Sequence, residues 1–143
     1  MKLAIDEARE GIRHDHGGPF GVVIVKDGVV LSKEHTTVLR DQDSTCHAEI
    51  QAIREASKKI HSFDLSGCIL FSTGKPCPMC SSAIKWAKIS QVYYSLLDPL
   101  LSYTKNFVNL IRAYAVIEWI YEKASCMGAH FYHISGTKSR MRR

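Results

Sequence analysis

The chain has 143 residues, of which 45% are hydrophobic and 23% are charged. A chain of this length and composition buries one hydrophobic core, so we expect a single domain over residues 1–143. No run approaches the roughly 18 apolar residues of a membrane span, and the amphipathic start is unlike a signal peptide, so we expect a soluble, cytoplasmic protein.

The net charge of +5 is concentrated at one end of the chain. Lys138, Arg140, Arg142 and Arg143 supply four of these charges, which leaves +1 for the rest. Short basic tails such as 136–143 are usually solvated ends, so a nucleic-acid partner stays open but is not favoured. The five cysteines are an odd number without the spacing of a disulfide scaffold, which favours a reducing compartment.

Periodicity predicts alternating helices and strands along the first two thirds of the chain. Residues 3–12 have helical spacing, and Asp27-Gly28 predicts a hairpin turn between strands at 20–25 and 29–32. Further helices are expected at 47–59 and 78–88, and further strands at 68–73 and 91–96. The last two strands flank a helix, so we expect a crossover that makes them parallel. The predicted fold class is therefore α/β.

The last third of the chain predicts one long helix and a final strand. Residues 103–125 carry an apolar helical pattern, and 129–135 are expected to form the strand. The pattern from Phe107 to Ile120 has more apolar surface than one helix needs against a sheet, so we expect a homodimer.

Three residues form a candidate zinc site. His47 opens the helix at 47–59, and Cys77 and Cys80 stand at i and i+3 where the helix at 78–88 begins, so both cysteines can face one point. Structural zinc usually has four protein ligands, whereas catalytic zinc keeps three and leaves one position to water. No fourth ligand at matching spacing stands out, which favours an open site. The field at the helix N-termini is expected to favour thiolates at the cysteines and a neutral His47.

Glu49 lies two residues after His47 and is the candidate proton shuttle. Zinc lowers the pKa of a bound water to about 7, and a carboxylate beside the metal can take the proton of that water and deliver it to a leaving amine. His-x-Glu alone is a weak signal, and Cys-x-x-Cys alone also fits a redox motif or structural zinc. In this order the two form H-x-E…P-C-x-x-C, the signature of zinc deaminases.

The segments GGPFGVVIVKDG (17–28), CHAEIQAIR (46–54), FDLSGCILF (63–71) and PCPMCSSAIKWA (76–87) resemble the cytidine deaminase-like superfamily, and within it the bacterial guanine deaminases. The resemblance covers about residues 1–95. It implies a three-layer α/β/α sandwich with a central mixed sheet of about five strands, one Zn²⁺ per chain and a homodimer. It also implies that Phe20, Thr36, Ala48 and Trp86 contact the base, although core packing explains the two aromatic residues about equally well.

Three features depart from the pattern of that family. Thr36 stands where the family has an asparagine that hydrogen-bonds the base, and Lys75 replaces the glutamate before Pro76-Cys77. A hydroxyl has fewer polar functions than an amide, and a lysine cannot accept a hydrogen bond. The region after residue 95 does not match the family's acidic segment and C-terminal tail. We therefore expect an intact metal site with altered base recognition.

Three functions follow, in order of preference. The first is hydrolytic deamination of a free purine base, with guanine converted to xanthine and ammonia. The second is deamination of adenosine in tRNA, or of cytosine or a nucleoside, which the basic tail favours. The third is a zinc-stabilised binding or assembly protein that has lost catalysis, which Thr36 and Lys75 favour and Glu49 opposes. Six further histidines, among them His14, His16 and His35, lack ligand spacing and are expected to be surface or hydrogen-bonded residues.

Overall fold

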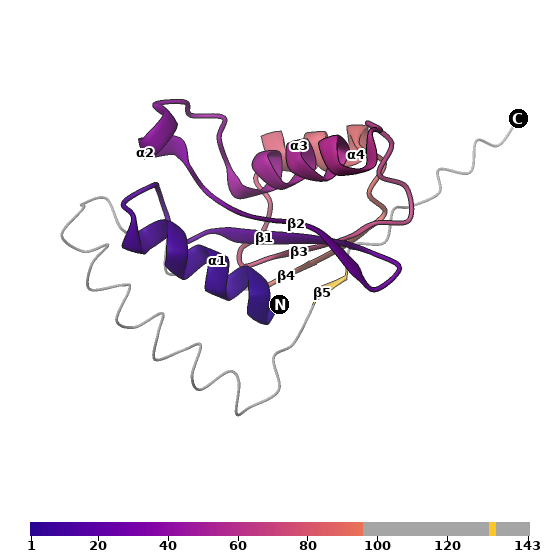
Figure 1. Cartoon of the computed structure of the whole chain (residues 1–143), viewed down its shortest axis with the longest axis horizontal. Coiled ribbons are helices and arrows are strands. Elements are labelled where there is room, and N and C mark those ends of the chain that lie inside the picture. Colours follow the sequence, from indigo (N-terminus) through magenta and orange to yellow (C-terminus); the bar gives the residue numbers. More distant parts are fainter. Residues whose placement is uncertain (96–131, 134–143) are drawn as a thin grey trace, which may run out of the picture.

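A computed structural model of the protein describes residues 1–95 and 132–133. The elements in chain order are α1 (Lys2–Arg13), β1 (Gly21–Lys26), β2 (Val29–His35), α2 (Val38–Asp41), α3 (Ala48–Ile60), β3 (Ile69–Ser72), α4 (Pro78–Trp86), β4 (Gln91–Tyr94) and β5 (Tyr132–His133) (Figure 1). The helices and strands predicted within the first 95 residues are confirmed, and β5 falls inside the strand expected at 129–135. The helix expected at 103–125 lies outside the described residues, and the single-domain prediction stays a prediction.

Five strands form one mixed sheet in the order β2-β1-β3-β4-β5. β3 and β4 are parallel, whereas the other neighbouring strands are antiparallel. The parallel pair arises because α4 carries the chain back to the end of the sheet at which β3 began. The predicted crossover and the mixed sheet of about five strands are both confirmed.

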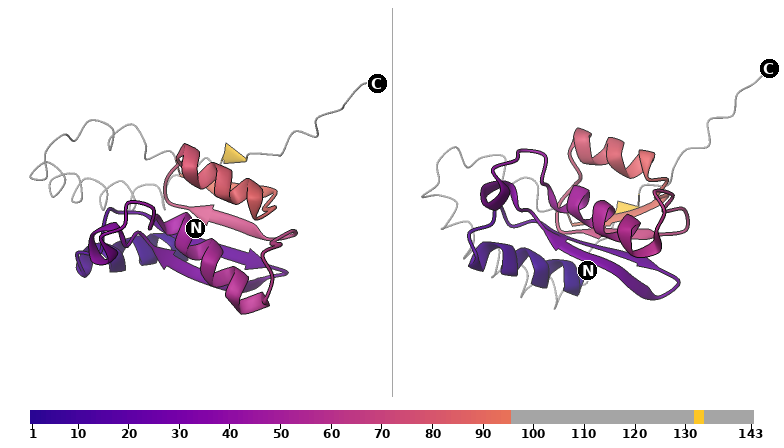
Figure 2. Two further views of the ribbon diagram at one scale, coloured as in Figure 1. Left: turned by 90° about the horizontal axis from the view of Figure 1, so that it is seen from above. Right: turned by 45° about the horizontal axis from the view of Figure 1, so that its top comes forward.

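The helices cover the two faces of the sheet and complete three layers. α1 lies on one face, and α3 and α4 lie side by side on the other (Figures 1 and 2). α1 packs directly on β1 at Gly21, where an added Cβ would collide with the carbonyl oxygen of Ala4 and lie 2.6 Å from the nitrogen of Ala8. Any larger residue at Gly21 would therefore push α1 away from the sheet. The expected α/β/α sandwich is confirmed.

The turn between β1 and β2 has the predicted chemistry. Asp27 and Gly28 have φ angles of 50° and 78°, the positive values that a two-residue hairpin turn requires. Aspartate and glycine adopt such angles at little cost, so the local sequence sets the register of the hairpin. Within residues 1–95 and 132–133, no helix has the length and apolar character that crossing a bilayer requires.

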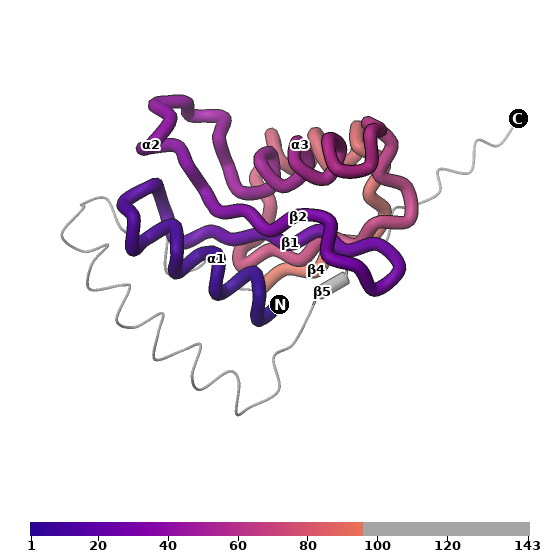
Figure 3. The backbone as a smooth tube through the Cα atoms, viewed as in Figure 1, coloured from indigo at the N-terminus to yellow at the C-terminus, as the bar shows by residue number. Residues whose placement is uncertain are grey.

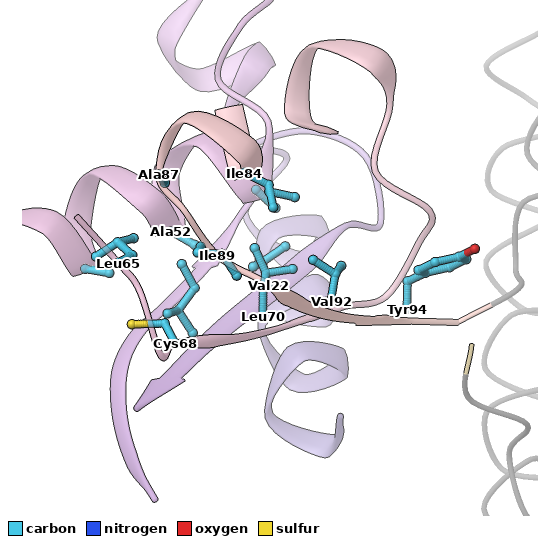
Figure 4. Packing of buried hydrophobic residues seen from close by; sticks show 13 residues of the cluster. Val22, Ala52, Leu65, Cys68, Leu70, Ile84, Ala87, Ile89, Val92 and Tyr94 are labelled. Atoms are coloured by element: carbon cyan, nitrogen blue, oxygen red, sulfur yellow. The ribbon is translucent and has the colours of Figure 1, made fainter. Parts of the chain in front are cut away.

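The main core lies between the sheet and the pair α3 and α4 (Figure 4). Val22, Ile24 and Leu70 project from the sheet, and α3 presents small alanines to them, Ala52 among them. Alanine side chains let a helix approach a sheet closely, and every one of these side chains is fully buried. The close contact fixes α3 over the sheet and thereby fixes where its first turn lies.

Candidate metal centre

The candidate ligands lie where α3 and α4 begin. His47 is the N-cap residue of α3, with φ −70° and ψ 154°, and Cys77 is the N-cap residue of α4, with φ −66° and ψ 170°. Pro78 follows at the start of α4, where its fixed φ suits a helix and no backbone hydrogen bond is lost. Figure 3 follows the backbone through the two segments that lead into these helices. Turns precede His47 and a bend precedes Cys77, and the two cap residues themselves are extended.

The three ligand atoms converge on one point. His47 Nδ1 lies 3.5 Å from Cys80 Sγ and 3.7 Å from Cys77 Sγ. Zinc–sulfur bonds of about 2.3 Å and zinc–nitrogen bonds of about 2.0 Å at a tetrahedral angle place a nitrogen and a sulfur about 3.5 Å apart. The spacing of the metal-free side chains therefore already fits a zinc ion. Among the described residues, His47, Cys77 and Cys80 are the one group of three or more such side chains that could hold a metal ion.

Burial opposes ionisation of the Cys80 thiol. Cys80 is 0% exposed, and its burial raises the pKa of the thiol strongly, with Glu49 and Cys77 raising it further. Burial in a low-dielectric environment disfavours the charged form of a thiol. The expected influence of the helix N-terminus on the cysteine thiols stays a prediction. A divalent cation bound by His47, Cys77 and Cys80 would supply positive charge that favours the thiolate form of the cysteines.

Glu49 lies at the edge of this group and is almost completely buried. It is 7% exposed, and its carboxylate is close enough to Cys80 to raise the pKa of that thiol. The hydroxyl of Ser72, at the end of β3, donates a hydrogen bond of 3.5 Å to Glu49 Oε1. Glu49 also stands in the first turn of α3, where the helix dipole favours a negative charge. A buried carboxylate beside a cluster of metal ligands is an arrangement suited to proton transfer.

Residues 1–96 match the family model of the cytidine and deoxycytidylate deaminase zinc-binding region. The chain belongs to this family. The family's zinc-binding region contains the His47, Cys77 and Cys80 group, and the predicted cofactor, one zinc ion, is thereby confirmed.

Guanine deaminases and tRNA adenosine deaminases are both among the proteins that the chain resembles. The chain is 44% identical over 95 residues to the guanine deaminase of Bacillus subtilis, which covers 66% of this chain and 61% of that protein. The solved structure of that guanine deaminase matches with a TM-score of 0.65 over 66% of this chain and 60% of the other. The tRNA-specific adenosine deaminase of Aquifex aeolicus is 33% identical over 138 residues, which cover 92% of this chain and 91% of that protein. A solved structure from a study of tRNA:A34 deaminases is 39% identical, with a TM-score of 0.66 over 69% of this chain and 71% of the other.

Two of the predicted base-contacting residues of this deaminase-family chain lie together. The backbone N–H of Thr36 donates a hydrogen bond of 3.1 Å to the carbonyl oxygen of Phe20. The ring of Phe20 lies against Gly18 and Gly74, where an added Cβ would come within 3.1 Å of it, and Thr36 is only 6% exposed. Both glycines give the ring its space. The roles of Phe20 and Thr36 in base binding stay predictions.

The other two predicted contacts lie in different surroundings. Ala48 is fully buried in the core, so a contact with a base would have to come from its backbone. Trp86 is 84% exposed and is the last residue of α4, whereas the cysteine ligands stand at the first turn of that helix. The described part of the chain does not enclose Trp86, whose side chain lines a shallow surface hollow with Ser82, Lys85 and Lys88. Within the described part of the chain Trp86 is not a core residue, and its role in base binding stays a prediction.

The histidines near the start of the chain bond to one another and to neighbouring carboxylates. His16 Nδ1 and His35 Nε2 are 2.9 Å apart, and His35 Nδ1 lies 3.4 Å from Glu7. His14 lies 2.8 Å from Glu10. The prediction that these three are surface or hydrogen-bonded residues is confirmed.

Sequence reasoning missed two features near the site. The first is α2, a single turn of four residues whose Asp41 accepts a 2.7 Å hydrogen bond from Thr37, which in turn accepts one of 2.8 Å from Gln51 of α3. One turn is too short to show helical periodicity. The second is Ser72, a buried hydroxyl at the end of β3. The signal was available in the alternation of that strand, since Leu70 and Ser72 share its inward face and a serine there needs a partner.

Proposed function

We propose that the protein is a zinc-dependent aminohydrolase that converts guanine and water to xanthine and ammonia. The observation that carries the proposal is Glu49, a carboxylate buried beside the His47, Cys77 and Cys80 group. A zinc site that only stabilises a fold has no need of a buried proton carrier. The 44% identity to a guanine deaminase favours guanine among the possible bases.

Each protein group has one task in this proposal. A zinc ion held by His47, Cys77 and Cys80 supplies Lewis-acid activation of water. Glu49 accepts the first proton of the attacking water and delivers it to the ring nitrogen. It then accepts the second proton, from the new hydroxyl group on the ring carbon, and delivers it to the leaving amine as the C–N bond breaks; such general acid–base work contributes roughly 10²–10⁴-fold to the rate. Because Glu49 has little access to solvent, its proton passes to the substrate in preference to bulk water.

The base is proposed to lie against Phe20, with Thr36 beside it. An aromatic face suits a purine ring, and the cradle of Gly18 and Gly74 holds the Phe20 ring in place. Thr36 offers one rotatable hydroxyl group at the position where the family pattern has the side-chain amide of an asparagine. Guanine is therefore expected to bind more weakly than it would to the asparagine of the family pattern.

Deamination of adenosine in tRNA is the second candidate, and the length of one alignment favours it. The match to the Aquifex aeolicus tRNA-specific adenosine deaminase spans 138 residues, whereas the match to guanine deaminase spans 95. The longer match reaches beyond residue 95, and the chain ends in a basic tail. Loss of catalysis with retention of zinc is the third candidate, supported by Thr36 and Lys75.

Ammonia release from a panel of amines distinguishes the three candidates. The panel contains guanine, adenine, cytosine, the triazine ammeline, their available nucleosides, and a tRNA anticodon stem-loop with adenosine at the wobble position. Release fastest from guanine supports the first candidate, and release from the stem-loop alone replaces it with the second. If protein that carries one zinc per chain releases ammonia from none of these compounds, the third candidate, loss of catalysis, is supported.

The homodimer and the cytoplasmic location belong to the same proposal. The segment expected to form the dimer contact, from Phe107 to Ile120, lies outside the described residues. The four cysteines within the described part are free thiols, which supports a reducing compartment. Light scattering that finds a monomer at micromolar concentration would refute the dimer.

A further inference from the structure

We infer that Ser72 is a positioning residue that orients the carboxylate of Glu49. The inference rests on the proposed function, because it assigns Ser72 a task in the proton transfer by Glu49. Ser72 is 1% exposed and is the last residue of β3, the strand whose end leads to Cys77 and Cys80. Its hydroxyl is therefore held by the sheet rather than by a loop.

The hydroxyl group of Ser72 accepts one hydrogen bond and donates another. The backbone N–H of Gly74 donates to Ser72 Oγ over 3.4 Å, so the oxygen already acts as an acceptor. The hydroxyl proton is then directed to Glu49 Oε1, 3.5 Å away. A serine hydroxyl has one proton to donate, so Ser72 fixes one carboxylate oxygen and leaves Oε2 for the substrate and water.

The backbone around Ser72 is fixed from both sides. Ser72 pairs with Val22 of β1 and with Tyr94 of β4, and its carbonyl oxygen accepts a hydrogen bond of 3.3 Å from the N–H of Ser95. The position of the hydroxyl is thus set by three strands at once.

The next residue anchors the end of β3 to the segment that carries Phe20. Thr73 Oγ1 accepts a 3.0 Å hydrogen bond from the N–H of Gly21 and donates one of 3.4 Å to the carbonyl oxygen of Pro19. The Thr73 hydroxyl is therefore engaged away from Glu49. The Glu49 carboxylate therefore interacts with the Ser72 hydroxyl on the strand side and with the Cys80 thiol on the side of the ligand group.

The orientation matters because Glu49 has to meet different atoms in succession. A general base works at hydrogen-bond distance from the proton it takes, and a misplacement of about 1 Å can lower a rate about 100-fold. Without the Ser72 hydroxyl, the carboxylate keeps its place on α3 but loses its fixed rotation. Binding of the base, which involves other residues, is expected to stay nearly unchanged.

Kinetics of Ser72→Ala in two backgrounds test the inference. In the parent, Ser72→Ala is expected to lower kcat for the best substrate about tenfold or more, with KM changed less than about twofold. In a Glu49→Gln background, the same substitution is expected to change the residual kcat less than about twofold, because the group it orients no longer carries protons. An equal loss in both backgrounds, or a parental kcat for Ser72→Ala, would overturn the inference.

Ser32→Ala is the matched control. Ser32 is also a buried strand serine, and its hydroxyl donates a 2.9 Å hydrogen bond to the carbonyl oxygen of Ala52 on α3, away from Glu49. Its removal is expected to lower thermal stability about as much as Ser72→Ala while leaving kcat within about twofold of the parent. A kcat loss in Ser32→Ala equal to that in Ser72→Ala would show a general structural effect and would overturn the inference.

A structural measurement separates failure of this inference from failure of the proposed function. Crystal structures of the zinc-loaded parent and Ser72→Ala are compared at the Glu49 side chain. A single carboxylate position bonded to Ser72 in the parent, and a rotated or divided one in the variant, supports the inference even if no tested base releases ammonia. The same single position in both proteins would overturn it whatever the activity.

Discussion

Thr36→Asn tests how base recognition in this protein differs from the family pattern. Thr36 is 6% exposed, and its backbone is bonded to Phe20, so the substituted side chain starts from a fixed position beside the proposed base site. Asparagine adds an N–H donor and a carbonyl acceptor on a longer arm. The parent offers the guanine oxygen only a rotatable hydroxyl, so the variant gains a directed hydrogen bond to a group that is otherwise poorly paired.

The size of the effect follows from two opposing contributions. A directed hydrogen bond to a buried group that would otherwise lack a partner contributes roughly 1–3 kcal/mol, and about 1.4 kcal/mol is tenfold in kcat/KM. The methyl group of Thr36 packs on Gly17, where an added Cβ would lie 2.8 Å from it, and its loss costs about 1 kcal/mol of folding free energy. We therefore expect kcat/KM for guanine to rise about tenfold or more while the melting temperature falls by about 4 °C.

The assay is steady-state ammonia release from guanine at matched zinc content, with thermal unfolding of the same samples. Ser90→Asn, at an exposed position after α4, is the control and is expected to change neither quantity. A kcat/KM for guanine in Thr36→Asn equal to that of the parent would refute the reasoning. Loss of activity on another base would show that the pocket serves that base, and guanine would then be the wrong substrate.

Three further predictions concern the metal, the proton carrier and the histidine pair. Cys77→Ala is expected to lower zinc from one per chain to well below that value, and full occupancy by metal analysis would contradict the ligand set. Glu49→Gln is expected to keep zinc and fold but to lose roughly 10²–10⁴-fold in kcat, since an amide cannot relay protons, and a parental rate would exclude the role. Burial and the neighbouring His35 lower the pKa of His16 below its usual 6.5. The unfolded chain therefore binds the proton of this histidine more readily than the folded chain does. The contribution of His16 to the free energy of unfolding is thus expected to be fully present above about pH 6.5 and to be lost as the pH falls. Urea unfolding at pH 7.5 and 5.5 measures this loss, and a loss in His16→Asn as large as in the parent would argue against the assignment.

Local sequence determined the elements and the ligand set because their causes are local. Asp27-Gly28 encodes its turn through backbone preferences, and Pro78 after Cys77 marks the start of α4. The spacing of Cys77 and Cys80 places both on one side of a helix, and that is enough to predict two ligands. His47 lies close to these cysteines only because α3 and α4 pack side by side. The sequence signature of the family nevertheless predicts that the three residues bind one metal ion.

Properties that depend on burial could not be derived in the same way. The raised pKa of the Cys80 thiol follows from its burial and from a carboxylate brought close by another helix, neither of which its neighbours in sequence reveal. The exposure of Trp86 follows from which face of α4 turns to the core, where Ile84 and Ala87 pack instead. The partnership of Ser72 with Glu49 joins residues 23 apart in sequence. Each of these depends on tertiary packing, which periodicity and motif spacing do not contain.

The most direct test of the zinc-dependent deaminase proposal is ammonia release from guanine before and after zinc is removed. The protein is stripped with a chelator, assayed, and assayed again after zinc is restored to one ion per chain. The account predicts no ammonia from the stripped protein and recovery of the full rate with zinc. An unchanged rate without zinc, or no ammonia from guanine at full zinc occupancy, would contradict it.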